Sequence, residues 1–256
     1  MGKWTCRGLS RLLRDRTKQK LGIVVLGTTG EASSLDSAER KFVVETAVKY
    51  SNAPVIVGTG TNSTRTTIQY TCEAEALGAN AALIVTPYYT RPTQEGLFQH
   101  YKAVHEASNL PIMLYNNPSR CGLNVSSEMI MRLASLERVV ALKESSGSLH
   151  ELTNTIALAA EYQPDFTLLS GDDCMAFPSI ALGAKGLVSV LSNIYPKEIQ
   201  EYVNLCLAGD MASARIEHYC WQPVIKELFA ETNPVSVKAM MRAMGLPAGK
   251  CRLPLC

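Results

Sequence analysis

A lysine at the end of an apolar segment, Lys143, is the residue whose surroundings most favour covalent chemistry. It follows Val139–Leu142 and precedes a Glu-Ser-Ser-Gly sequence, a pattern typical of a buried strand that ends in a turn. Burial disfavours the charged form of a lysine, so such a side chain can present the neutral amine that attacks a carbonyl to form a Schiff base. The alternative is a lysine that extends from the strand end into solvent.

Polar side chains follow five other apolar segments of the sequence. They lie in the sequences Gly-Thr-Thr-Gly-Glu at 27–31, Gly-Thr-Gly-Thr-Asn at 58–62, Thr-Pro-Tyr-Tyr at 86–89, Tyr-Asn-Asn-Pro-Ser-Arg at 115–120 and Ser-Gly-Asp-Asp at 170–173. Hydroxyl and backbone N–H donors suit a carboxylate, a tyrosine hydroxyl can relay protons, and an arginine binds a carboxylate through two hydrogen bonds. If the segments are parallel strands, these groups meet Lys143 at one end of the sheet.

The same sequences permit simpler interpretations. The glycine-rich turns fit ordinary strand-to-helix connections, and neither matches a nucleotide-binding pattern. Asp172 and Asp173 suggest a metal, but no histidine or third carboxylate lies beside them in the sequence, so we favour the cap of a helix. The eight cysteines show no zinc spacing, and reduced thiols of a cytoplasmic protein fit them best.

The alternation of strand and helix patterns predicts an α/β fold. Seven apolar segments are predicted as strands: Leu21–Leu26, Pro54–Gly58, Ala81–Val85, Pro111–Leu114, Val139–Leu142, Phe166–Leu169 and Gly186–Val190. Stretches of helical length lie between them, at 37–50, 63–77, 94–105 and 149–161. This order indicates parallel βαβ units, and seven strands at nearly even spacing favour a TIM (β/α)8-type barrel that lacks its first strand.

The pattern after residue 195 is wholly helical. Three helices are predicted there, at Pro196–Leu207, Met211–Phe229 and Val235–Met244. We therefore expect a barrel at residues 1–195, truncated at its N-terminus, and a C-terminal helical region at residues 196–256 packed against it.

Charge is distributed unevenly along the 256 residues. The net charge is +2, but residues 1–20 hold seven Lys or Arg and one Asp, which leaves 18 basic and 22 acidic residues in the remainder. We therefore expect no nucleic-acid partner, and no apolar stretch is long enough to predict a membrane span. Residues 9–20 are expected to form a helix with Leu9, Leu12 and Leu13 on its inner face, and a transit peptide is the alternative.

The polar sequences at the strand ends carry a family resemblance. The segments 27–31, 85–89, 115–122, 141–144 and 169–173 together resemble the dihydrodipicolinate synthase family of pyruvate-dependent class I aldolases, a superfamily that also holds N-acetylneuraminate lyase. The match extends from about Leu21 to Pro254 and includes Asn233-Pro234 and the Arg-Leu-Pro sequence at 252–254.

The resemblance implies a catalytic role for four residues. Lys143 would form the Schiff base with pyruvate, and Tyr115 would be the general acid and base. Thr28 would hydrogen-bond into the proton relay of Tyr115. Tyr89 resembles the relay tyrosine that the family contributes across a dimer interface.

The resemblance also implies a substrate-binding role for four residues. Thr29 would bind the carboxylate of pyruvate, and Arg120 would bind the carboxylate of the incoming aldehyde. Gly171 and Val188 match positions that line the pocket.

The activity implied by the resemblance is the condensation of pyruvate with L-aspartate-4-semialdehyde on the route to diaminopimelate and lysine. No metal or organic cofactor is expected, because the lysine imine itself accepts the electrons. A homodimer or homotetramer is expected.

Two alternatives remain open: another pyruvate-dependent aldolase that acts on a sugar acid, and a truncated barrel without catalytic activity. The chain also departs from the family pattern at Asn117, where a small or aliphatic residue is usual.

Overall fold

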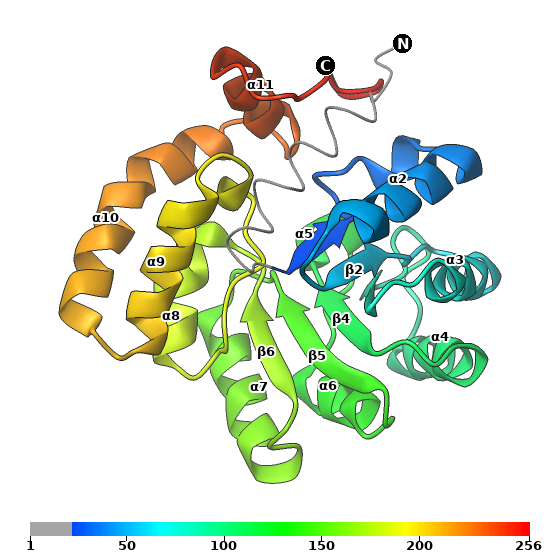
Figure 1. The fold of residues 1–256 in the computed structure, drawn as a ribbon. Helices are drawn as coiled ribbons and strands as arrows, with labels where there is room; N and C mark the ends of the chain where they lie inside the picture. The colour runs from blue at the N-terminus through cyan, green and yellow to red at the C-terminus, as the bar shows by residue number, and fades with distance from the viewer. Residues whose placement is uncertain (1–21) are drawn as a thin grey trace.

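The structure is a computed structural model, and it describes residues 22–256. Its centre is one sheet of six parallel strands whose order in space follows their order in the chain (Figure 1). The strands are β1 Ile23–Val25, β2 Val55–Gly58, β3 Ala81–Val85, β4 Ile112–Asn116, β5 Val139–Glu144 and β6 Thr167–Ser170. The sheet curves, with helices on its outer face. This architecture confirms the predicted α/β fold of the TIM-barrel type.

The helices divide into two groups along the chain (Figure 1). Those between the strands are α2 Ser37–Tyr50, α3 Thr64–Ala76, α4 Gln94–Ala107, α5 Pro118–Cys121, α6 Ser127–Ala134 and α7 Leu149–Tyr162. Those after β6 are α8 Ala176–Ala181, α9 Pro196–Leu207, α10 Met211–Leu228 and α11 Val235–Ala243. None of these helices is both long and apolar enough to cross a membrane.

Side-chain caps define where the outer helices begin. Asp36 accepts a hydrogen bond from the backbone N–H of Glu39, whose carboxylate accepts one from the backbone of Asp36 in return. A serine or threonine caps α3, α4, α6 and α7 in the same position. Each cap satisfies N–H groups that the first turn of a helix leaves unpaired, so the helix start is encoded locally.

The apolar core lies mainly between the sheet and the outer helices. Leu97, Tyr101 and Val104 on α4 are fully buried there. The inner face of the sheet holds a smaller apolar cluster that contains Leu83, Met113, Tyr115 and Ala141. A third cluster joins α8, α9, α10 and α11. The large apolar core on the outer face of the sheet and the small cluster on its inner face leave room for a cavity at the inner face.

Six of the predicted strands are present, but the seventh, Gly186–Val190, was wrong in extent. Only Leu187 pairs with the sheet, through a single parallel bridge to Ser170. The backbone N–H of Val190 donates instead to the carboxylate of Asp173, at 2.9 Å. The chain then enters the short helix η3 at Leu191–Asn193. The predicted helix at residues 9–20 lies outside the described residues.

Candidate active site

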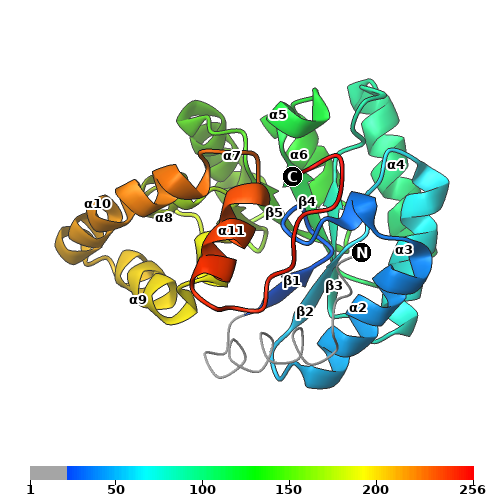
Figure 2. The same ribbon diagram turned by 90° about the horizontal axis from the view of Figure 1, so that it is seen from above.

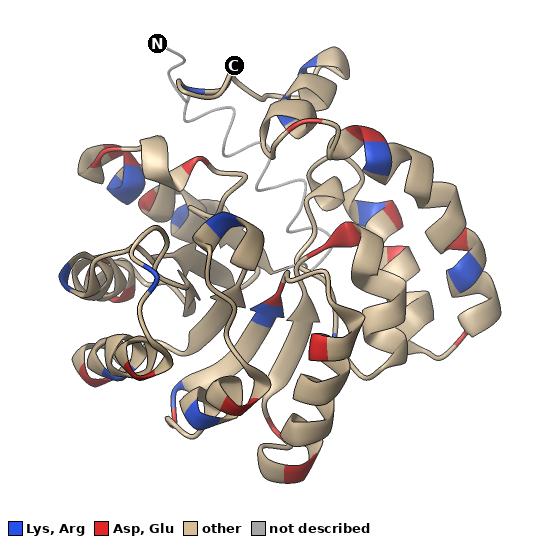
Figure 3. Cartoon of the chain, turned by 180° about the vertical axis from the view of Figure 1, so that it is seen from behind, with Lys and Arg blue, Asp and Glu red and all other residues tan. Residues whose placement is uncertain are grey.

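Lys143 and Tyr115 face each other across neighbouring strands. They are partners in the parallel register of β4 and β5. The Nζ atom of Lys143 lies 4.0 Å from the centre of the Tyr115 ring. Lys143 and Glu144 are the only charged residues in the six described strands, whereas most Lys, Arg, Asp and Glu lie on helices and loops (Figure 3). Strand alternation directs Lys143 inward and Glu144 outward, so one amine enters the inner face.

The hydroxyl of Tyr115 is surrounded by hydrogen-bonding groups. The amide Nδ2 of Asn117 donates to it at 2.9 Å. Burial alone would raise the pKa of Tyr115, but the charge of Lys143 and hydrogen bonds with Asn117, Thr28 and Lys143 bring this pKa below its ordinary value. A phenol with a lowered pKa next to an amine is suited to accept and return protons.

The stem of Lys143 passes so close to Gly171 that no side chain fits there. A Cβ atom on Gly171 would lie 2.7 Å from Cε of Lys143 and 2.0 Å from Oγ of Ser145. Both distances are shorter than van der Waals contact. The turn after β6 therefore needs glycine at this position, because any Cβ atom would clash with the side chain of Lys143.

The C-terminal region contacts two of the predicted site residues. Nδ2 of Asn233 donates to the hydroxyl of Thr29 at 2.9 Å. Nη2 of Arg120 donates to the backbone carbonyl of Asn233 at 3.2 Å. One residue that precedes α11 thus joins the loop after β1 to the helix after β4.

The loop after β1 is also held by an ion pair. Glu31 is 6 % exposed, and its carboxylate accepts hydrogen bonds from Nζ of Lys238 and from the backbone N–H of Arg252, the latter at 2.7 Å. The guanidinium of Arg252 pairs with Glu39. Figure 2 shows the segment after α11 returning across the top of the sheet toward α2. These contacts fix the loop that carries Thr28 and Thr29; we name them the C-terminal clasp.

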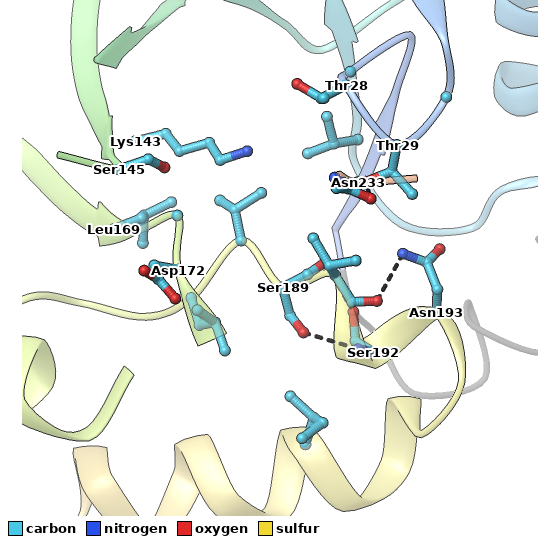
Figure 4. A pocket seen from close by; sticks show the side chains of 18 of the residues that line it. Thr28, Thr29, Lys143, Ser145, Leu169, Asp172, Ser189, Ser192, Asn193 and Asn233 are labelled. Atoms are coloured by element: carbon cyan, nitrogen blue, oxygen red, sulfur yellow. Dashed lines mark hydrogen bonds between the residues drawn. The ribbon is translucent and has the colours of Figure 1, made fainter. Parts of the chain in front are cut away.

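A cleft of about 1510 Å³ opens at the inner face of the sheet (Figure 4). It is lined by seven of the eight predicted site residues: Thr28, Thr29, Tyr115, Arg120, Lys143, Gly171 and Val188. Figure 4 shows Lys143 extending into the open space and Thr28 and Thr29 on the opposite side. The arrangement brings an amine, a phenol, hydroxyls and a guanidinium to one cavity, which suits imine chemistry on a substrate with carboxylates.

Tyr89 does not join this cluster. Its side chain is 88 % exposed on the connection between β3 and α4, and its φ of 71° lies in the left-handed region. The role predicted for it requires a second subunit and stays a prediction.

Two neighbours of the site were not given a role from the sequence. Asn117 bonds to the phenol of Tyr115, and Asn233 bonds to Thr29. The sequence distinguished Asn117 only as a departure from the family pattern and Asn233 only as part of the matching Asn-Pro sequence. Because asparagine is common in turns and helix caps, neither signal indicated a contact with the site.

The comparisons with known proteins agree with this geometry. The model of the dihydrodipicolinate synthetase family matches residues 5–256. The chain belongs to this family. A 4-hydroxy-tetrahydrodipicolinate synthase of Thermodesulfovibrio yellowstonii is 46 % identical over 258 residues, which cover 100 % of this chain and 88 % of the relative.

Solved structures of the family share the fold closely. The dihydrodipicolinate synthase of Thermotoga maritima superposes with a TM-score of 0.96 at 39 % identity, over 99 % of this chain and 88 % of the other. The chloride-inhibited enzyme of Acinetobacter baumannii, solved as a complex with pyruvate, gives a TM-score of 0.95 at 40 % identity, over 100 % of this chain and 88 % of the other. The chain therefore shares the barrel fold of the family.

Proposed function

We propose that this protein condenses pyruvate with L-aspartate-4-semialdehyde through a Schiff base on Lys143. The observation that carries the proposal is the amine of Lys143, 4.0 Å from the Tyr115 ring, inside a cleft that also contains Arg120. The names of the relatives support the same activity, because curated proteins 42–47 % identical to the chain are 4-hydroxy-tetrahydrodipicolinate synthases.

The first half of the reaction activates pyruvate. The neutral amine of Lys143 attacks the ketone carbon, and water leaves as the imine forms. The protonated imine then accepts the electron pair released when the methyl group loses a proton, which gives an enamine. We assign the proton transfers of these steps to Tyr115, and the hydrogen bond between its hydroxyl and Thr28 supports this assignment. The imine is the electron acceptor, so this chemistry calls for neither a metal nor an organic cofactor.

The second half joins the two substrates. The enamine carbon attacks the aldehyde carbon, and the new alkoxide takes up a proton. The amine of the aldehyde substrate then displaces Lys143 from the imine carbon, which closes the ring of the product and frees the enzyme. We assign Thr29 to the carboxylate of pyruvate and Arg120 to that of the aldehyde, with Gly171 and Val188 as walls of the pocket.

The assembly that we propose is a homodimer or a homotetramer. The support is the family resemblance at Tyr89, whose side chain is 88 % exposed and therefore accessible to a partner. A second subunit would cover this ring, and the family resemblance assigns the tyrosine to the relay of that subunit.

The decisive experiment is reduction with borohydride in the presence of pyruvate. We expect a covalent adduct that peptide mass spectrometry locates on Lys143, and no adduct in Lys143→Arg, whose guanidinium stays protonated and cannot attack. An adduct on another lysine, or none in folded protein, would refute the proposal. If the adduct forms but sugar aldehydes are used faster than aspartate semialdehyde, the protein is the alternative aldolase of sugar acids.

A further inference from the structure

The side chain of Asn117 connects the hydroxyl of Tyr115 to the start of α5. Asn117 is 7 % exposed. Its Oδ1 atom accepts hydrogen bonds from the backbone N–H of Arg120, at 3.3 Å, and from the hydroxyl of Ser119, at 2.8 Å. Its Nδ2 atom lies 2.9 Å from the oxygen of Tyr115. The amide therefore links Tyr115, to which we assign the proton transfers, to the helix α5, which carries Arg120.

The orientation of this amide is determined by its partners. A backbone N–H can only donate, so the atom that faces Arg120 must be the oxygen. The atom that faces Tyr115 is then the NH2 group, which can only donate. The phenol oxygen accepts this hydrogen bond, and its own proton must point elsewhere.

We propose that Asn117 is a positioning residue that holds the Tyr115 hydroxyl as an acceptor, so that its proton is exchanged only on the side of Thr28 and Lys143. The proposal rests on the proposed function, because it concerns the proton transfers of that reaction. An unsupported phenol rotates its O–H among several acceptors. The bond from Asn117 removes one of these directions and favours the phenolate at the same time.

Few charged groups compete with Asn117 around the phenol. On β5 the neighbouring cation is Lys143, 4.0 Å from the ring centre. On α5 the guanidinium of Arg120 donates to the carbonyl of Asn233. On the loop after β1 the carboxylate of Glu31 is paired with Lys238. Burial opposes ionisation of Tyr115, and the hydrogen bond from Asn117 is one of the contacts that bring its pKa below the ordinary value.

Two variants separate the donor from the helix cap. Serine and aspartate are both good caps, so Asn117→Ser and Asn117→Asp keep an acceptor for the start of α5. In Asn117→Ser the hydroxyl lies one bond closer to the backbone than Nδ2 does, so it no longer reaches the oxygen of Tyr115. Asn117→Asp replaces the donor with a negative acceptor. A purely structural role predicts no change at Tyr115 in Asn117→Ser. The charge introduced in Asn117→Asp raises the pKa of a neighbouring phenol whatever the native amide does, so Asn117→Ser is the deciding variant.

The readouts are the titration of Tyr115 and the steady-state rate. We follow the phenol by NMR of protein with 13C-labelled tyrosine, and Tyr115→Phe identifies its signal. In Asn117→Ser we expect the midpoint to rise by about one pH unit and kcat to fall about ten-fold, the scale of one hydrogen bond. In Asn117→Asp we expect a larger change in the same direction. KM for pyruvate should change less than kcat.

Asn154→Ser, at an exposed position of α7, is the matched control and should titrate as the wild type does. A midpoint in Asn117→Ser equal to that of the wild type, or an unchanged kcat in both Asn117 variants, overturns the proposal. If Asn117→Asp does not fold, Asn117→Ser alone decides. The titration needs no substrate, so a failure of pyruvate to form the adduct on Lys143 refutes the proposed function without affecting this test.

Discussion

In the proposed function, Arg120 is the residue that binds the carboxylate of the aldehyde. Its guanidinium is held by the carbonyl of Asn233, yet the side chain is exposed and lines the cleft. Because a charge-assisted hydrogen bond contributes about 1.5–3 kcal/mol, Arg120→Ala should lower kcat/KM for aspartate semialdehyde by about 10- to 150-fold. The pyruvate KM should change little. Steady-state kinetics with each substrate varied in turn checks this, and equal losses for both would contradict the assignment.

Gly171 offers a test of the path that Lys143 takes. In Gly171→Ala the new methyl group would lie 2.7 Å from Cε of Lys143, so the lysine must move out of its position beside Tyr115. We expect the rate of pyruvate adduct formation to fall by about 100-fold or more, the cost of a misplaced reacting group. Circular dichroism should show an unchanged fold. Gly147→Ala is the comparison, because no atom lies within 4 Å of its added Cβ, although its φ of 73° adds some strain.

The groups that we propose to react are easier to recognise in the sequence than the residues that support them. Lys143 could be singled out because a cation at the end of a buried strand is rare and has a chemical reason. Asn117 could not, because its role depends on the rotamer of Tyr115 and on the start of a four-residue helix. Those are properties of the folded chain, and no local pattern encodes them.

At the scale of elements, the contact between α3 and α4 makes the fold sensitive to acid. His100 on α4 is 5 % exposed, and its Nδ1 atom bonds to the hydroxyl of Thr64 at 2.9 Å. Burial lowers the pKa of His100 from 6.5 to about 4. In the unfolded chain the same histidine binds a proton near pH 6.5. The unfolded state therefore gains protons first as the pH falls, and the folded state loses stability between about pH 6.5 and pH 4.

Between pH 6.5 and pH 4, we expect His100 to lower the free energy of unfolding by at most about 3 kcal/mol. Denaturant unfolding at pH 7 and pH 5 should show a smaller loss in His100→Gln than in the wild type. The exposed His150 serves as control, and His150→Gln should keep the wild-type dependence. Burial also lowers the pKa of His105 and His218, so part of the acid sensitivity should remain in His100→Gln. The same pH dependence in all three proteins would exclude His100 as a source.

Helices and strands were predictable where neighbouring residues in the sequence determine where the element begins. The helix α2 begins at a reciprocal pair of hydrogen bonds between Asp36 and Glu39, which are three residues apart and visible in the sequence. The segment Gly186–Val190 looked equally typical of a strand. It does not continue in the sheet, because the carboxylate of Asp173, which is distant in the sequence, accepts the hydrogen bond from the backbone N–H of Val190. Local patterns cannot report such a partner.

At the scale of the whole molecule, the relay role that we propose for Tyr89 requires a second subunit. Tyr89 is exposed and does not line the cleft of its own chain, so activity should depend on protein concentration. We expect activity per subunit to fall on dilution, in step with dissociation followed by analytical ultracentrifugation. Tyr89→Phe, which keeps the ring but removes the hydroxyl, should lower activity without lowering association. A monomer with full activity would overturn both the relay role and the assembly.

The boundary predicted at residue 195 stays a prediction, and the packing bears on how it would behave. One apolar cluster contains Ala176 and Leu191 from before this boundary and Leu228 and Val237 from after it. Because the two parts share buried surface, we expect them to unfold in one transition and not as separate domains.

The C-terminal clasp has a consequence for how the protein is degraded by proteases in the cell. Lys250 is exposed and lies between Lys238 and Arg252, the two residues that hold Glu31. A protease that cuts beside Lys250 would detach Arg252 from the loop of Thr28 and Thr29 while the buried sheet stays intact. Catalysis would then be lost before the protein is degraded. The half-life of the enzyme's activity would thus be shorter than the half-life of the polypeptide.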